Sequence, residues 1–257
     1  MKSSIAITSK VFDCAGRHPG VYNIDDLLSD VEAGAFDPSN EQIKFVFGQV
    51  FSDEEKQKLK ALLSLSSHNN KYLATMLEPV AGGVVHKRRS DNSLITPILK
   101  VGDKYMCDLV VPKGNDMVAD HVTGEHISGM VLIEAARQMS MAVIDSRFDD
   151  GRKRYQIINE LTADFTTFVH PFETRMVMHF DEFRAKGDKC YIDCTVGLWQ
   201  ADSLRTSVRM TGMCFLQSFA QKMESKSMTK ILRDLGVGKS IADVGNLISD
   251  KEVEEEL

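Results

Sequence analysis

Hydrophobic and polar positions divide the chain into three zones. Residues 1–84 mix short helical patterns with polar loops, and in "FSDEEKQKLKALLSL" Ser52 and Glu55 have capping-box spacing ahead of leucines at helical intervals. Residues 85–219 combine alternating stretches with one long apolar segment. Residues 220–257 return to helical periodicity, with apolar stripes at Ile231, Leu232 and Leu235 and at Ile241, Val244, Leu247 and Ile248. We therefore predict a mixed, mainly helical N-terminal extension, a central domain and a helical C-terminal tail.

Within the central zone, most of the patterning is that of strands joined by tight turns. "SLITPILKVGDKYMCDLVV" predicts two strands around a Gly-Asp turn, and "TRMVMHFDEFRAKGDKCYIDCTVGLWQ" predicts two more around residues 186–188. "YQIINELTADFTTFVHP" and "LRTSVRMTGMCFLQS" supply further strands. Because no helix separates the later strands, we expect antiparallel pairing and an α+β domain. "VAGGVV" at 80–85 resembles a hinge before this domain.

The composition limits the class of protein. In the 257 residues, 43% hydrophobic and 26% charged content is typical of a soluble globular protein. The formal charge of −6 argues against a nucleic-acid partner, and the short basic run "HKRR" at 86–89 is typical of a solvated surface. We see no signal peptide or membrane span and expect a cytoplasmic protein with reduced thiols, since its five cysteines are odd in number. Cys190 and Cys194 would share one face of a strand, which favours core packing over metal binding.

The long apolar segment predicts a helix over about Gly129–Asp145 that carries a polar stripe. Glu134, Arg137 and Gln138 fall on one side of it, at intervals of three and four residues. A buried carboxylate must be paired or protonated. Two interpretations remain open. Glu134 and Arg137 form a structural ion pair at a subunit contact, or Glu134 faces a site as a general base or as a group that orients a substrate.

The loop before this helix adds candidate chemistry. Gly129 stands where a helix leaves its first N–H groups unpaired, and such groups can polarise the carbonyl oxygen of a thioester. His121 and His126 lie just upstream, where an imidazole can exchange protons near neutral pH. With Asp120 and Glu125 nearby, the two histidines still do not have the spacing of a metal motif, so we expect no metal site.

The stretch "DHVTGEHISGMVLIEAARQ" resembles the central motif of the A-factor synthase (AfsA) family of hotdog domains. The resemblance rests on Asp120, His121, Gly124, Gly129, Met130, Leu132, Glu134, Ala135, Arg137 and Gln138. "VVHKRR" at 84–89 and "ADFTTFVHP" after the helix resemble the segments that flank this motif in the family. The resemblance therefore covers roughly residues 84–219. The resemblance implies a hotdog fold, in which an antiparallel sheet wraps a long central helix, here with helical N- and C-terminal extensions.

The resemblance also implies an enzyme. Family members transfer a β-ketoacyl group from acyl carrier protein to the hydroxyl of dihydroxyacetone phosphate, on the way to γ-butyrolactone-type signals. The partners would be acyl carrier protein or acyl-CoA and a small phosphorylated acceptor, without a further cofactor. By this reading the catalytic residues are Glu134, His121 and Arg137, and the substrate-binding residues are Gln138, Gly129, Met130, His126 and Asp120. The best-known members carry two hotdog domains, whereas this chain has one copy, so we expect a homodimer.

Three other functions stay open. A hotdog thioesterase would use a similar helix carboxylate with water as the nucleophile. A β-hydroxyacyl dehydratase would use a loop histidine and a helix acid, but its histidine stands one residue further from the acid than His121 does from Glu134, and Ser128 replaces its usual proline. A non-catalytic acyl-binding or regulatory module would keep the pocket without the chemistry, although it has no need of a buried carboxylate.

Overall fold

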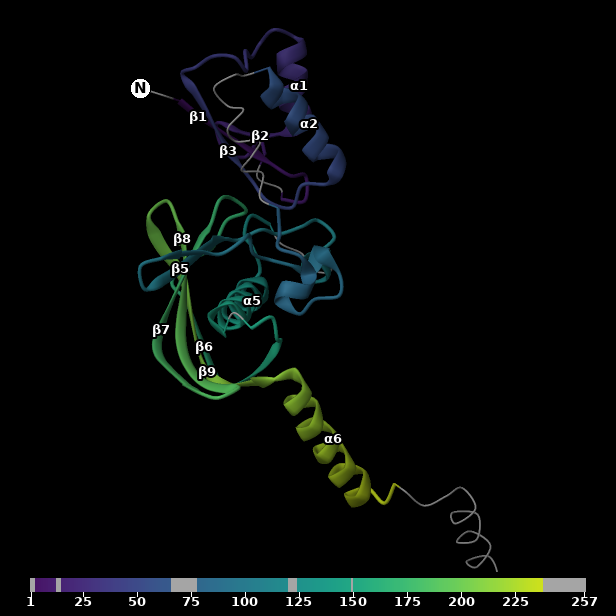
Figure 1. Ribbon diagram of the computed structural model, residues 1–257. Helices are drawn as coiled ribbons and strands as arrows, with labels where there is room; N and C mark the ends of the chain where they lie inside the picture. The colour runs from purple at the N-terminus through teal and green to yellow at the C-terminus, as the bar shows by residue number, and fades with distance from the viewer. Residues whose placement is uncertain (1–2, 13–14, 66–77, 120–123, 149, 238–257) are drawn as a thin grey trace, which may run out of the picture.

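The computed structural model describes residues 3–12, 15–65, 78–119, 124–148 and 150–237. Figure 1 shows three parts: a small N-terminal domain, a curved sheet around a central helix, and a C-terminal helix that projects away from the body. The central part is the hotdog arrangement that the sequence predicted, and it positions the candidate site.

A six-stranded sheet wraps the central helix α5 (Gly129–Phe148). Its order is β4-β5-β7-β8-β9-β6, and every neighbouring pair is antiparallel, as predicted. The strands are β4 (Leu99–Val101), β5 (Lys104–Asp108), β6 (Arg154–Phe165), β7 (Arg175–Lys186), β8 (Lys189–Gln200) and β9 (Ser203–Leu216). Gly102 and Gly187 occupy the two predicted turns with φ of 63° and 59°, a left-handed conformation that glycine adopts without strain.

The core lies between this sheet and α5. Alternate residues of β8, including Cys190, Ile192 and Cys194, are at most 1% exposed, which confirms the predicted core packing of the two cysteines. On α5, Val131, Ala135 and most of the other apolar side chains are buried. A helix that is apolar almost all round is stable here because the curved sheet covers so much of its circumference.

The N-terminal domain differs from the prediction. Its helices are α1 (Ile24–Glu32) and α2 (Asp53–Ser64), and Ser52 with Glu55 forms the predicted capping box at the start of α2. However, these helices accompany a parallel sheet of order β2-β1-β3 that the sequence analysis did not foresee. Its strands are β1 (Ser3–Thr8), β2 (Val21–Asn23) and β3 (Ile43–Phe47). The expected mainly helical extension is therefore corrected to a mixed α/β domain.

The segment at 80–85 is part of the hotdog core and not a hinge. The Val80 amide donates to the carbonyl oxygen of Ile95, and the 3₁₀ turn η1 (Gly82–Val85) buries Val85 completely against the core. Two short elements, η2 (Ser90–Asn92) and α4 (Asp116–Ala119), follow before α5. The hotdog unit thus begins before residue 85.

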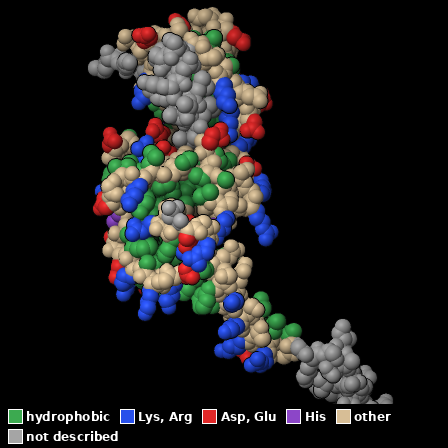
Figure 2. All heavy atoms as spheres, viewed as in Figure 1, with side chains coloured by type: hydrophobic (Ala, Val, Ile, Leu, Met, Phe, Trp, Pro, Cys, Tyr) green, Lys and Arg blue, Asp and Glu red, His purple; other side chains and the backbone are tan. Residues whose placement is uncertain are grey.

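The C-terminal helix α6 (Gln217–Asp234) confirms the predicted helical tail as far as the structure describes it. The apolar stripe predicted at 241–248 lies outside the described residues. Figure 2 shows hydrophobic and basic side chains side by side along α6, and Phe219, Met228 and Leu235 are at least half exposed. Among the described helices, none is long and apolar enough to span a membrane.

Candidate active site

The polar stripe of α5 forms one hydrogen-bonded cluster around Glu134. The Arg137 guanidinium donates two hydrogen bonds to the carboxylate, from Nε to Oε2 and from Nη2 to Oε1, each at 2.8 Å. Gln138 Nε2 donates to Oε1 at 3.0 Å. The predicted partners at positions i+3 and i+4 are therefore correct. The Glu134 side chain is only 16% exposed, so these bonds compensate its removal from water.

Lys87 completes the cluster and was not predicted. Its Nζ lies 2.7 Å from Glu134 Oε1, and its side chain is 28% exposed. Residues 86–89 were interpreted as a solvated basic run, which is wrong for Lys87. The only signal in the sequence was the resemblance of "VVHKRR" to the opening of the family's domain. With two cations around one carboxylate, the cluster carries a net positive charge.

The charge state of Glu134 follows from its surroundings. Burial raises the pKa of its carboxyl group, but hydrogen bonds from Arg137, Lys87 and Gln138 outweigh burial and bring the pKa from 4.5 down to about 2. At neutral pH the group is a carboxylate whose two oxygens already accept four hydrogen bonds. Such a group is a weak proton acceptor. The geometry therefore favours an orienting role for Glu134 over a general-base role.

The Gln138 side chain links α5 to the segment before β4 by hydrogen bonds. Its side chain is fully buried; Oε1 accepts from the Leu94 amide at 2.8 Å and Nε2 donates to the Asn92 carbonyl at 2.8 Å. Together with the bond to Glu134, these contacts occupy both ends of the amide. This position suits a residue that fixes the cluster, whereas substrate binding by Gln138 was the prediction.

The start of α5 lies beside the end of β6. The Gly129 and Met130 amides donate no hydrogen bond to other described residues, as expected for the first turn of a helix. A Cβ at Gly129 would lie 3.0 Å from the ring of Phe165, so glycine permits the close approach of β6. Met130 is 61% exposed, and His126 packs on Phe168 with ring centroids 4.8 Å apart.

Two of the predicted site residues, Asp120 and His121, lie outside the described residues. Glu125, next to His126, contacts the N-terminal domain through His18 Nε2 at 3.2 Å. No group of three or more histidine, cysteine, aspartate or glutamate side chains in the described part of the chain could hold a metal ion.

Comparison with known families decides the assignment. A model of the A-factor biosynthesis hotdog domain (AfsA) matches residues 68–216, more than half of the chain. This chain belongs to the AfsA hotdog family. The match includes the Glu134 cluster and its lysine, and it begins before residue 85, in agreement with the packing of η1 into the hotdog core.

Other comparisons are weaker. No curated protein matches the chain. Among solved structures, a phenylacetic acid degradation-related protein from Ralstonia eutropha JMP134 is 14% identical with a TM-score of 0.38, covering 56% of this chain and 97% of its own. A thioesterase from Pseudomonas aeruginosa is 12% identical with a TM-score of 0.37, covering 52% and 85%. Similarity at this level decides nothing about the activity of the AfsA hotdog chain.

Proposed function

We propose that this AfsA hotdog protein is an acyl-thioester transferase that moves a β-ketoacyl group from acyl carrier protein or coenzyme A to the hydroxyl of a dihydroxyacetone phosphate-like acceptor. The observation that supports it best is the cluster of Lys87 and Arg137 around Glu134, inside the segment that matches the family. A partly buried site with net positive charge suits a phosphorylated substrate.

In this proposal, Glu134 holds Lys87 and Arg137 in place and the two cations bind the acceptor phosphate. The amides of Gly129 and Met130 receive the thioester oxygen. His121 accepts the proton of the attacking hydroxyl, because a carboxylate with a pKa of about 2 is a poor base. The hydroxyl oxygen bonds to the acyl carbon, the C–S bond breaks, and the imidazolium returns its proton to the leaving thiolate.

A second candidate is a non-catalytic acyl-binding module. Sequence analysis counted the buried carboxylate against it, because a binder needs no such group. The contacts of Glu134 weaken that objection, since they give the carboxylate a structural task at the junction of α5 with Lys87.

The test is mass spectrometry of the purified protein with a β-ketoacyl thioester, with and without dihydroxyacetone phosphate. We expect a phosphorylated acyl ester only when both substrates are present, and its loss in Arg137→Ala and His121→Ala. Arg152→Ala, which removes an exposed arginine elsewhere, is the control. Free acid without the acceptor would indicate a thioesterase instead. Binding of an unreacted thioester would favour the acyl-binding module.

A further inference from the structure

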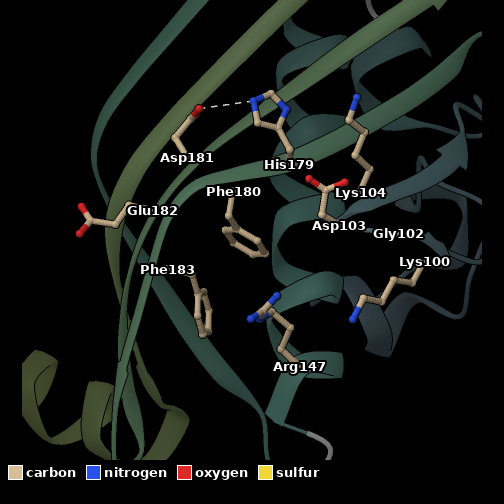
Figure 3. Close-up of a pocket in the computed structure, with 10 residues that line it drawn as sticks. All are labelled: Lys100, Gly102, Asp103, Lys104, Arg147, His179, Phe180, Asp181, Glu182 and Phe183. Carbon is tan, nitrogen blue, oxygen red and sulfur yellow. Dashed lines mark ion pairs between the residues drawn. The ribbon is translucent and has the colours of Figure 1, made fainter.

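A hollow lies at the C-terminal end of α5, away from the start of the helix. One part, of about 460 Å³, is lined by the β4–β5 turn, the C-terminal turn of α5 and residues 179–183 of β7 (Figure 3). The adjoining part, of about 590 Å³, is lined mainly by apolar side chains: Val80, Val84, Ile98, Tyr105 and Ala142. Both volumes are in the range of small-molecule pockets. The two parts share Lys100 and Arg147.

Lys100 and Arg147 are cations without a carboxylate partner in the described part of the chain. Arg147 donates one hydrogen bond to the Tyr105 hydroxyl at 3.0 Å and stacks on Phe183 with its guanidinium carbon 4.2 Å from the ring centroid. Lys100 Nζ lies over the Tyr105 ring at 6.0 Å. In Figure 3 the Lys100 amine is directed toward Arg147, whose guanidinium extends toward the rings of Phe180 and Phe183. Most of the other arginines of the hotdog unit are paired with a carboxylate: Arg89, Arg137, Arg152, Arg154, Arg175, Arg184 and Arg209.

Three carboxylates line the hollow: Asp181 and Glu182 are engaged by other side chains, and Asp103 lies on the β4–β5 turn. Asp181 accepts from Thr195 at 2.9 Å and faces His179 at 3.4 Å, and Glu182 pairs with Arg184 and points outward in Figure 3. The two unpaired cations therefore stand where the polar part of the hollow meets the part lined mainly by apolar side chains. An apolar lining favours an aliphatic chain, and two neighbouring cations favour an anionic group at its end.

The hollow is separate from the Glu134 cluster. Arg147 lies thirteen residues beyond Glu134, which is about 20 Å along a helix axis. Ser146, which also lines the hollow, is rotated about 120° around the helix from Glu134 at 100° per residue. A group bound at one place therefore faces a different side of α5 from a group bound at the other.

We propose that this hollow binds an anionic amphiphile, with its aliphatic chain between α5, η1 and β4 and its carboxylate or phosphate head between Lys100 and Arg147. Either a free fatty acid or an alkyl phosphate has this chemistry. The site would be distinct from the one at which the thioester reacts, and it does not depend on the proposed transferase activity.

The experiment is calorimetric titration of the full chain with octanoate, decanoate and dodecanoate, with decyl phosphate and with decanol, each below its micelle concentration or solubility limit. We expect saturable binding of at least one anion, at least tenfold weaker binding of decanol, and affinity that rises on the order of tenfold for each two added methylenes. Comparing decanoate with decyl phosphate identifies the preferred head group.

Two variants with the same charge change separate direct contact from long-range attraction. Lys100→Glu should weaken anion binding at least tenfold. Lys189→Glu, at an exposed position of β8 outside the lining of the hollow, should change it less than threefold. Both variants should keep the wild-type rate of thioester turnover. Equal effects of the two variants, decanol binding as tightly as decanoate, the absence of saturable binding, or loss of turnover in Lys100→Glu would each overturn the proposal.

Discussion

Glu134 contributes stability to the fold whether or not it also serves a reaction. Because folding lowers its pKa from 4.5 to about 2, the stabilisation by the ionised form is fully present above about pH 5 and is lost as the pH falls toward 2. We expect Glu134→Gln to lower the free energy of unfolding at pH 7 by roughly 2 kcal/mol, because Lys87 and Arg137 would lose their counter-charge. Urea denaturation at several pH values measures this difference, which should shrink below about pH 4.

Glu224→Gln, which changes an exposed carboxylate on α6, is the control for that series and should alter stability little at any pH. If the Glu134→Gln difference stayed the same from pH 7 to pH 3, the carboxylate would not be held by its cations as described.

Gln138 allows a test of structural against substrate-binding roles. Gln138→Leu keeps the size of the side chain but leaves the buried Leu94 amide without its acceptor. An unsatisfied buried amide costs roughly 1–3 kcal/mol, so we expect a loss of that size in the free energy of unfolding. Denaturant titration beside Gln221→Leu, at an exposed position of α6, provides the comparison. Unchanged stability with lost acyl transfer would contradict this structural role of Gln138 and favour a role in substrate binding.

At this scale, the sequence predicts the residues that one helix brings together and misses the others. Helical periodicity alone places Arg137 and Gln138 beside Glu134. Lys87 comes from another part of the chain, and periodicity within α5 carries no information about it. Periodicity is equally uninformative about the Asn92 and Leu94 backbone groups that form hydrogen bonds with the Gln138 side chain.

Among the elements, the pairing of β6 with β9 depends on a glycine. The register between them shifts at Ile158 and Glu160, and there a Cβ on Gly212 would overlap the Ile157 carbonyl oxygen and lie 3.1 Å from its carbon. We expect Gly212→Ala to lower the free energy of unfolding by roughly 2–4 kcal/mol, because the backbone must move. Gly197→Ala on β8 should cost less than about 1 kcal/mol, since its nearest neighbours are side-chain ends that can shift. Thermal denaturation of both variants checks the contrast, and equal losses would contradict it.

Strands are predicted correctly from the sequence where their alternation of apolar and polar residues is long and their partner strand is close in the chain. Strands of 12 to 14 residues joined by two-residue turns, such as β7, β8 and β9, show their alternation clearly. The parallel strands β1, β2 and β3 have 3 to 6 residues each and pair across long connections. Neither a tight turn nor a long alternation marks such a sheet in the sequence.

At the scale of the whole molecule, β6 leaves one edge of the sheet open. Among the described strands it pairs only with β9, and Tyr155, Ile157, Leu161 and Phe165 are 36–49% exposed on it. A long edge strand with exposed apolar side chains invites pairing with another chain. Because a two-fold axis pairs such an edge with itself, we propose that β6 joins two copies, in line with the homodimer expected from the single hotdog copy.

Charges on β6 test this dimer. We expect the purified chain to elute with twice its own mass in size-exclusion chromatography with light scattering, and the double variant Ile157→Lys, Leu161→Lys to elute as a monomer, because like charges would face each other across the interface. Leu99→Lys, at a 67% exposed leucine on the opposite edge strand β4, should remain a dimer. A wild-type monomer, or a dimer that only Leu99→Lys disrupts, would show that β6 is not the interface.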